Sequence, residues 1–466
     1  MPAVRDPASF RDPDGSVYLV GERVIRAFLP EGARKWAILK ASGLLEDLLQ
    51  RGLVLAYEEK ALKDIPELQE EAPGVCAIVE HPRLPFLSYC YEWPFSMLKD
   101  AGVCTLEVAE RALERGFILK DATPYNIQFL GARPVLIDLA SLEPYREGEP
   151  WRAYHQFCCL FLNPLLLEAT TGVPFQPWLR GALGGLRPTD LAPLLPWRWR
   201  MRPFVFTHVV AQAWLERHFA SDVAQEGHRP LPRVEREQVL RLLRSLRRGL
   251  ERLRPRKPAG LWARYQEECH YHPEAQRAKE AFVEGALQSL RPRVVWDLGC
   301  NIGHYSLLAA RYADLVVGMD SDIQAVDLFY QRVREKARNV LPLVMDLLDP
   351  SPNRGWAEEE RRGLAQRGPA DLVLCLALVH HLAIQGNLPF GHLVRWLARV
   401  GRAVVVEFVP KEDPRAHNLL RWREDVFPWY TQGAFETALE ECFTIRERFA
   451  LPHSGRVLYT AIRRGL

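Results

Sequence analysis

Short apolar runs alternate with longer amphipathic stretches from about residue 260 to the end of the chain. Five of these runs have the length of a strand and are rich in Leu and Val: VVWDLG, LVVGMD, LPLVMD, DLVLCLAL and AVVVEFV. Segments with helical spacing separate them. Parallel strands need long crossover connections, which are usually helices. The pattern therefore predicts a parallel α/β sheet wrapped by helices.

The preceding residues have a different pattern. Residues 1–150 mix helices with short strand-like runs such as SVYLV, CAIVE and PVLIDL, and residues 151–258 have a helical pattern interrupted by Pro and Gly. The second segment ends in a helix whose apolar residues recur at 239, 242, 243, 246, 250 and 253. We therefore expect three parts, 1–150, 151–258 and 259–466, with RPRKP as the linker before the third.

Length, charge and cysteine content limit which classes of protein the chain can belong to. A chain of 466 residues is too long for one core. The net charge of +3 does not indicate a polyanion partner, and the nine cysteines are scattered without CxxC spacing. The polar N-terminus and the lack of an 18-residue apolar run predict neither a signal peptide nor a membrane span. We expect a reduced, cytoplasmic chain without disulfides or a zinc site.

One segment is much more basic than the whole chain. Residues 228–257 hold ten Arg and one Lys against three Glu. Such a helix can contact a phosphate backbone. It can also present a solvated face with Glu–Arg pairs on a bundle. The Leu residues on its other face favour the second interpretation.

The strongest motif is VVWDLGCNIGHYSLLAA, residues 294–310. A strand ends at Asp297, and Gly299 and Gly303 precede an apolar helix. Glycine is needed where a backbone turns tightly or where a ligand lies against it. A structural turn or a dinucleotide site gives the same pattern, but the G-x-G-x-x-G of dehydrogenases is absent from this loop.

The next three strands also end in polar residues. Asp320 follows 23 residues after Asp297 and can accept two hydrogen bonds from a ribose diol. Asp346 ends the third strand, where a carboxylate can accept from an exocyclic amine. The fourth strand leads into His380 and His381. Ligands of doubly wound sheets bind at these carboxyl ends, so the four strands predict one site.

This succession resembles the class I S-adenosylmethionine (SAM) methyltransferases over residues 262–466. The resemblance implies a Rossmann-like, seven-stranded methyltransferase sheet with SAM as cofactor. It also implies that the 297–303 loop, with Cys300 and Asn301, holds the methionine and ribose parts. Asp320 and Ser321 would lie at the ribose, and Asp346 and Leu347 at the adenine. Asn301 replaces the middle glycine of the common D-x-G-x-G-x-G form.

A helix-like segment, 262–282, precedes the first strand. In similar enzymes such a segment closes over SAM, which makes Tyr265, Tyr271 and Lys279 candidates, although packing is an alternative role for each tyrosine. His270 and His272 flank Tyr271. Because a third ligand is not evident in the sequence, we expect no metal there.

SAM carries its own electrophile, so the enzyme mainly aligns the methyl group and the acceptor. A hydroxyl or amine acceptor can also need a base, and His380, His381 and Glu407 are the catalytic candidates. Of the two histidines we prefer His381. The alternatives are that the histidines only begin the next helix, and that Glu407 forms a salt bridge or a helix cap.

The whole chain resembles a narrower family of bacterial methyltransferases, some labelled host-specificity nodulation proteins. The segments that carry this resemblance include LSYCYEWPFSMLKDA, PWRAYHQFCCLFLNPL, DPSPNRGWAEEERRGLAQRGPADLVLCLALVHHLAI and VVVEFVPKEDP. The family implies the reaction class and leaves the acceptor open.

LKDATPYNIQF with PVLIDLAS resembles kinase catalytic and metal-binding loops. The resemblance places Asp121 as the loop aspartate, and Asn126 and Asp138 as ligands of the metal. A Gly-rich phosphate loop and a V-A-I-K-like lysine are missing, and Lys120 replaces the loop His or Arg. We interpret the N-terminal part as a degenerate kinase-like α+β domain with a helical lobe. The alternatives are an active kinase using Mg–ATP, and a buried hydrogen-bond network.

Our sequence-based hypothesis is a SAM-dependent methyltransferase acting on an oxygen or nitrogen acceptor, with the kinase-like domain assisting acceptor binding. The alternatives are a bifunctional kinase–methyltransferase and a non-catalytic SAM-binding module. RNA, a glycan, a protein and a small molecule all remain open as the acceptor, and the sequence does not predict the oligomeric state.

Overall fold

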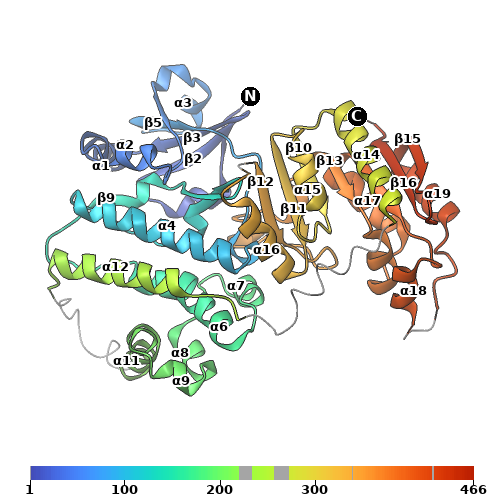
Figure 1. Ribbon diagram of the computed structural model, residues 1–466. Coiled ribbons are helices and arrows are strands. Elements are labelled where there is room, and N and C mark those ends of the chain that lie inside the picture. The colour runs from blue at the N-terminus through green and yellow to red at the C-terminus, as the bar shows by residue number, and fades with distance from the viewer. Residues whose placement is uncertain (1, 220–232, 257–271, 338, 422–424, 466) are drawn as a thin grey trace. The chain divides into compact units, whose positions relative to one another are not determined.

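The computed structural model describes residues 2–219, 233–256, 272–337, 339–421 and 425–465 (Figure 1). The chain forms two compact units. Unit 1 comprises Met1–Leu130, Pro134–Pro258 and Gly355–Arg361. Unit 2 comprises Gly131–Arg133, Ala259–Arg354 and Arg362–Leu466.

Short strands dominate the first part of the chain. They are β1 (Val4–Arg5), β2 (Gly15–Val20), β3 (Arg23–Phe28), β4 (Glu58–Lys60), β5 (Ala77–His81), β6 (Phe117–Leu119), β7 (Ile127–Leu130), β8 (Arg133–Leu136) and β9 (Leu142–Pro144).

The first five strands form an antiparallel sheet in the order β1-β2-β3-β5-β4. Its strands alternate in burial, as expected for a sheet with one face on a core. In β3, for example, Ile25 and Ala27 are buried and Arg26 between them is partly exposed. The ladders β6-β9 and β7-β8 are separate two-stranded sheets.

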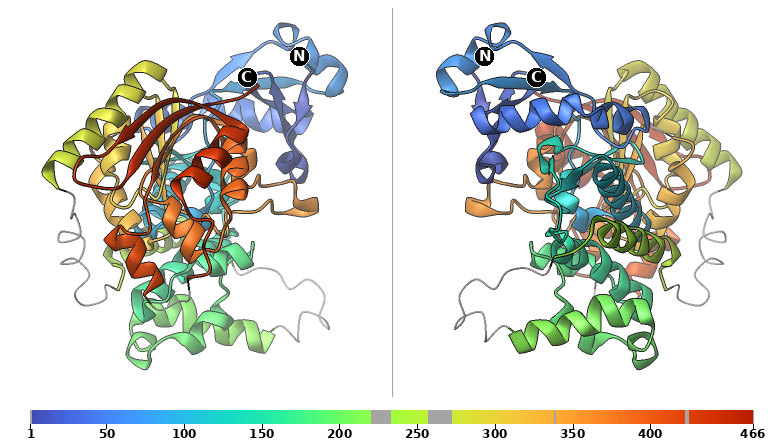
Figure 2. Two further views of the ribbon diagram at one scale, coloured as in Figure 1. Left: turned by 90° about the vertical axis from the view of Figure 1, so that its right-hand side faces the viewer. Right: turned by 90° about the vertical axis from the view of Figure 1, so that its left-hand side faces the viewer.

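Helices make up most of the remainder of unit 1. They are α1 (Pro30–Ala41), α2 (Leu44–Gln50), α3 (Glu67–Glu71), α4 (Phe95–Glu114), α5 (Tyr154–Phe157), α6 (Asn163–Thr171), α7 (Gln176–Gly181), α8 (Pro188–Leu191), α9 (Trp197–Arg200), α10 (Pro203–Val205), α11 (Ala211–Phe219) and α12 (Arg236–Arg252). Within this unit, Figure 2 shows the five-stranded sheet and helices α8, α9 and α11 at opposite ends.

The basic helix predicted from the sequence is α12, which packs on α4. Its buried side chains are Val239, Leu240, Leu243, Leu246 and Leu250, in agreement with the helical spacing. Some of its arginines contact α4 directly: Arg247 pairs with Glu110 at 2.7 Å and Arg244 with Glu114 at 2.9 Å. Some of the positive charge of α12 is therefore neutralised by glutamates of α4.

Unit 2 alternates helices and strands. They are α14 (Pro273–Leu290), β10 (Val294–Leu298), α15 (His304–Ala309), β11 (Leu315–Asp320), α16 (Ile323–Val333), β12 (Val340–Val344), β13 (Ala370–Cys375), α17 (Phe390–Val400), β14 (Gly401–Phe408), α18 (Pro414–Leu420), α19 (Gln432–Cys442), β15 (Phe443–Ala450) and β16 (Val457–Arg463).

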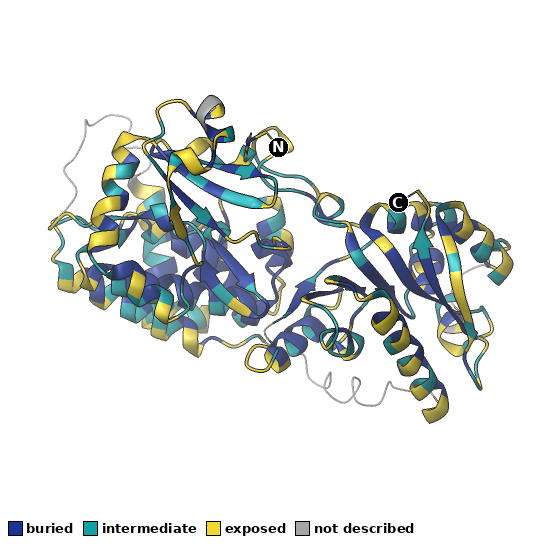
Figure 3. Ribbon diagram, turned by 90° about the horizontal axis from the view of Figure 1, so that it is seen from above, coloured by how far each residue is buried: buried dark blue, intermediate teal, exposed yellow. Residues whose placement is uncertain are grey.

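The described strands of this unit form one mixed sheet in the order β12-β11-β10-β13-β14-β16-β15. The first five are parallel, whereas β16 is antiparallel to β14 and to β15. The methyltransferase-like α/β fold that the sequence predicts is thereby confirmed. Figure 3 shows that the inner strands of the sheet are mainly buried, whereas the edge strand β15 is largely exposed.

The strand order also determines which helices share a face of the sheet. The chain moves from β10 through β11 to β12 in one direction and from β13 to β14 in the other. Because such crossovers are right-handed, α15 and α16 cover one face and α17 covers the opposite face. The order reverses between β10 and β13, so a crevice is expected at their carboxyl ends. Among the described residues, none of the helices is both long and apolar enough to cross a membrane.

Candidate active site

A cavity of about 1720 Å³ lies within unit 2 at the carboxyl ends of the parallel strands. The residues that follow β10, β11, β12 and β13 all contribute to its lining, together with the N-terminal part of α14 and the loop between β15 and β16. The cavity therefore occupies the crevice that the strand order predicts.

The turn after β10 is formed by residues with left-handed backbone. Gly299 has a φ of 74° and Gly303 a φ of 82°. A Cβ atom at Gly303 would lie 2.0 Å from the ring of Phe329, so a larger residue cannot be accommodated without a shift. Asn301 also has a positive φ, 50°. Asn adopts this conformation more readily than most residues, which explains how it replaces the middle glycine.

Asp297 is the second-last residue of β10 and is only 2% exposed. Its Oδ2 accepts a hydrogen bond of 2.5 Å from the hydroxyl of Ser306. Burial raises its pKa to about 6, because the hydrogen bond from Ser306 only partly offsets the loss of water and the negative charge of Asp320 adds to the effect. Asp297 therefore changes its charge near neutral pH.

Asp320 lies at the end of β11 and borders the cavity. Its carboxylate accepts hydrogen bonds from the backbone N–H groups of Asn301 (2.8 Å) and Asp322 (2.9 Å). These bonds fix the orientation of the carboxylate, and each oxygen keeps a further lone pair for a ligand. Ser321 beside it is exposed and also lines the cavity.

Asp346 and Leu347 follow β12 and line the same cavity. Asp346 is exposed, and its Oδ1 accepts a hydrogen bond of 2.9 Å from the backbone N–H of Leu348. Cys300 is buried, and burial raises the pKa of its thiol well above the ordinary value. Cys300 is therefore a neutral thiol that contributes to the cavity wall without nucleophilic character.

The two adjacent histidines differ sharply in environment. His380 is 1% exposed and lines the cavity, and its two ring nitrogens have no hydrogen-bond partner among the described residues. Burial and the nearby positive groups lower its pKa to about 3. His381 also borders the cavity but is exposed, and its Nδ1 lies 3.2 Å from the side-chain oxygen of Gln385.

Glu407 of β14 is completely buried between two cations. Its carboxylate contacts Lys279 Nζ at 2.6 Å and a guanidinium nitrogen of Arg456 at 3.2 Å. Arg456 also pairs with Asp413 at 2.7 Å. Burial alone would raise the pKa of Glu407, but Lys279 and Arg456 outweigh it and lower the pKa below its usual value. A carboxylate held ionised by two cations is a poor proton acceptor.

Lys279, which the sequence predicts to contact SAM, lies on α14, and that contact stays a prediction. Its side chain is buried against Glu407 and contributes to the cavity wall. Its partner could not be identified from sequence patterns, because the two residues are 128 positions apart. Tyr265 and Tyr271, the other candidates from that segment, lie outside the described residues.

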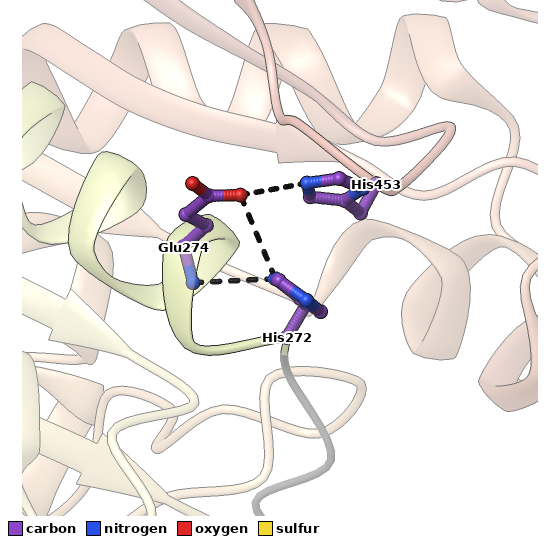
Figure 4. Close-up of side chains that lie close together, drawn as sticks. All are labelled: His272, Glu274 and His453. Carbon is purple, nitrogen blue, oxygen red and sulfur yellow. Dashed lines mark hydrogen bonds and ion pairs between the residues drawn. The ribbon is translucent and has the colours of Figure 1, made fainter.

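A second group of polar side chains lies at the rim of the cavity. His272 precedes α14, Glu274 lies in its first turn, and His453 belongs to the loop between β15 and β16 (Figure 4). Glu274 Oε2 lies 2.7 Å from His453 Nε2 and 3.9 Å from His272 Nδ1. One potential ligand atom of each residue lies within 4.8 Å of the others. His272 stands out in the sequence beside His270 and Tyr271, whereas His453 is 179 positions from Glu274 and could not be connected with it from the sequence.

Unit 1 gathers the residues of the kinase-like motif. Asp121 follows β6, and Asp138 follows β8; burial, and then the charge of Asp138, raise the pKa of Asp121. The backbone carbonyl of Asn126 accepts a hydrogen bond from Ile137 N–H. Asp138 forms an ion pair of 2.8 Å with Arg26 of β3, a residue that the sequence analysis did not select.

Comparisons with known proteins agree with a relationship over nearly the whole chain. No family model matches the chain. It is similar to the nodulation protein NoeA of Rhizobium meliloti (strain 1021), with 35% identity over 462 residues, which cover 98% of this chain and 95% of that protein. The resemblance to nodulation proteins that the motifs indicate is thereby confirmed.

Solved structures give weaker similarities that cover less than half of the chain. The N-methyltransferase NodS from Bradyrhizobium japonicum WM9 is 13% identical, with a TM-score of 0.31, and covers 41% of this chain and 97% of its own. The magnesium protoporphyrin IX methyltransferase ChlM from Synechocystis PCC 6803, with bound SAM, is 18% identical, with a TM-score of 0.31, and covers 44% and 92%. The bifunctional kinase-methyltransferase WbdD is 21% identical, with a TM-score of 0.29, and covers 40% and 39%. The fold assignment above therefore depends on the strand order.

Proposed function

The chain belongs to the family of the nodulation protein NoeA, and we propose that it is a SAM-dependent methyltransferase acting on an oxygen or nitrogen acceptor. The observation that carries the proposal is the cavity of unit 2. A glycine turn, two strand-end carboxylates and a buried histidine line this one cavity, at the point where the strand order reverses.

The lining residues fit SAM in charge and shape. Gly299 lines the cavity without a side chain, so a ligand can lie against its backbone, and the free lone pairs of Asp320 suit a ribose diol. Asp346 and Leu347 offer a carboxylate and an apolar contact for adenine. When bound there, SAM supplies the electrophilic methyl group.

His380 is the residue that we propose to contact the acceptor. Methyl transfer to a hydroxyl or an amine requires that the acceptor present a lone pair in line and afterwards lose a proton. A neutral, buried imidazole can accept a hydrogen bond from the acceptor and so orient it, and such positioning is worth about 7–11 kcal/mol of barrier in favourable cases. We prefer His380 to His381, because His381 is exposed and has Gln385 as a neighbour.

Glu407 has a different role in this proposal. Its ion pairs with Lys279 and Arg456 hold these two cations in the cavity wall, so that Glu407 positions charges rather than accepting a proton. Arg456 also pairs with Asp413, so two cations face two carboxylates and the network adds no net charge to the wall.

Unit 1 is proposed to be a kinase-like domain that assists acceptor binding. Asp138, the candidate metal ligand, is already paired with Arg26, and Arg26 also contacts Asp12 at 3.3 Å. A metal at Asp138 has to compete with a guanidinium, which weakens the alternative of a kinase that transfers phosphate.

The test is transfer of a radiolabelled methyl group from SAM into a lysate of the source organism, followed by nuclease, protease and organic extraction. We expect label in one fraction, which identifies the acceptor class, and loss of label with Asp320→Asn. The control is Asp314→Asn, the same substitution at an exposed Asp–Arg pair of unit 2. Titration of the wild type and both variants with S-adenosylhomocysteine separates the outcomes. If the wild type binds the ligand but labels no fraction, the non-catalytic module is favoured. If the wild type does not bind it, the proposal is overturned.

A further inference from the structure

Three potential metal ligands meet beside the cavity, although the chain separates His453 widely from His272 and Glu274. Glu274 and His453 are 179 positions apart and are joined by a contact of 2.7 Å. The rings of His272 and His453 lie side by side, with centroids 4.3 Å apart (Figure 4). All three side chains are about half exposed, at 53%, 63% and 54%, so they can rotate to meet an ion that enters from solvent.

We propose that His272, Glu274 and His453 bind one divalent transition-metal ion, in the first place Zn²⁺. Two imidazoles and one carboxylate are a common ligand set for zinc, and they leave a fourth position open. Ligand atoms at tetrahedral zinc are about 3.3 Å apart, given bonds of about 2.0–2.1 Å. The contacts of Glu274 Oε2, 2.7 Å to His453 and 3.9 Å to His272, lie on either side of that value, so small side-chain movements suffice.

The backbone around the three residues is already held in place. His272 is the N-cap of α14, and its Nδ1 accepts a hydrogen bond of 3.4 Å from the N–H of Glu274. His272 therefore keeps Nε2 for a metal in this arrangement, or exchanges the cap for ligation through Nδ1. His453 has a φ of 54°, a left-handed conformation that histidine adopts more readily than most residues other than glycine.

A metal at these residues would connect two walls of the cavity. Glu274 belongs to α14, which also carries Lys279, and His453 precedes Arg456 in the loop before β16. Lys279 and Arg456 both hold Glu407. The ion thus joins, at the rim, the same two segments that Glu407 joins in the interior. This inference does not depend on methyl transfer, because it concerns only ligand geometry.

The chain contains a matched pair for comparison. His304 is exposed and Glu280 half-buried, both line the cavity, and their side chains lie 2.8 Å apart. This pair offers one imidazole and one carboxylate, without the second histidine. Zinc prefers four ligands, so His304 and Glu280 should bind it much more weakly than the triad.

The experiment uses the full-length, chelator-treated protein. It is titrated with Co²⁺, with visible absorption as the readout, and separately with Zn²⁺, with calorimetry as the readout. We expect one ion per chain in the wild type and an affinity at least about tenfold lower in His272→Ala, Glu274→Gln and His453→Ala, since even the loss of groups that only orient a ligand costs about 10–100-fold. His304→Ala should bind like the wild type.

Two further measurements keep the result interpretable. Circular dichroism confirms that each variant is folded, and Zn²⁺ should raise the thermal midpoint of the wild type but not of His453→Ala. Binding of S-adenosylhomocysteine, measured on the same samples, reports on the methyltransferase proposal separately. Absence of stoichiometric binding, or equal binding by the triad variants, or equal loss in His304→Ala, would overturn the metal site.

Discussion

At the scale of single residues, Asp297 links the stability of unit 2 to pH. Its folded-state pKa of about 6 lies above the 3.8 of a free carboxyl, so the folded chain holds this proton more tightly than the unfolded chain does. The stability is therefore fully present below pH 4, falls as the pH rises from 4 to 6 and remains lower above 6. A shift of about two units corresponds to roughly 3 kcal/mol.

Asp297→Asn should remove this penalty, because a neutral amide can still accept the hydrogen bond of Ser306 through its oxygen. We expect the variant to be more stable than the wild type at pH 7.5 and equally stable near pH 4, as measured by urea unfolding across this range. The same substitution should weaken binding of S-adenosylhomocysteine, since stability and function often oppose each other at such sites. A stability difference that is constant with pH contradicts the assignment.

His380 provides a second prediction at this scale. Its pKa of about 3 keeps the imidazole neutral throughout the range above pH 5, so His380 should contribute no inflection near pH 6.5 to the pH profile of methyl transfer. His380→Phe should lower kcat about 100-fold or more, with little change in binding of S-adenosylhomocysteine.

Two further variants test the choice between the adjacent histidines. His380→Gln retains a hydrogen-bond acceptor and should keep part of the activity. His381→Ala should behave like the wild type, because that ring faces solvent. A larger loss of kcat in His381→Ala than in His380→Phe would favour His381, the residue preferred from the sequence alone.

At the scale of elements, Glu407 ties β14 to α14 and to the loop before β16. Glu407→Gln should destabilise unit 2 by about 3–5 kcal/mol, because it takes the buried counter-charge from Lys279 and leaves Arg456 with Asp413 alone. Lys279 and Arg456 are only 3% and 8% exposed, so water cannot replace the lost carboxylate.

Thermal unfolding of matched variants measures this effect. The exposed pair of Asp314 with Arg293 is the control, and Asp314→Asn should leave the midpoint almost unchanged. A similar small effect of Glu407→Gln would mean that the network is hydrated. The double variant Glu407→Gln with Lys279→Met should be more stable than Glu407→Gln alone, because the second substitution removes the cation that lost its partner.

The strands of unit 2 could be predicted because their signals are local. β10, β11 and β12 are apolar runs, and each ends within two residues of an aspartate: Asp297, Asp320 and Asp346, respectively. Because the strands are parallel, these ends lie on one edge of the sheet. The glycine turn is equally local, since its backbone conformation depends on residues within a few positions.

The charged networks could not be predicted, because their members are distant in the sequence. Lys279 and Glu407 are 128 positions apart, and nothing in the runs around them indicates the pairing. Asp138 and Arg26 lie in strand-like segments whose own patterns account for them without an ion pair. The preference for His381 over His380 had no basis in local pattern either, since only the fold determines which ring is buried.

At the scale of the whole molecule, two compact units predict two thermal transitions in calorimetry of the full chain. S-adenosylhomocysteine should raise only the transition of unit 2. At a ligand concentration of 100 times Kd the stabilisation is about 2.7 kcal/mol, which corresponds to a shift of roughly 5–10 °C for a unit of about 200 residues.

Mg–ATP should leave both transitions unchanged, because the carboxylate of Asp138 that a metal would need is paired with Arg26. Arg26→Lys tests this reason directly, because lysine makes a single-point contact in place of the guanidinium fork and holds the carboxylate of Asp138 less firmly. If Mg–ATP raises a thermal transition of the variant but not of the wild type, the ion pair of Asp138 with Arg26 is what prevents Mg–ATP from binding. A shift already present in the wild type would instead support the bifunctional kinase–methyltransferase, and Asp138→Asn should then abolish it.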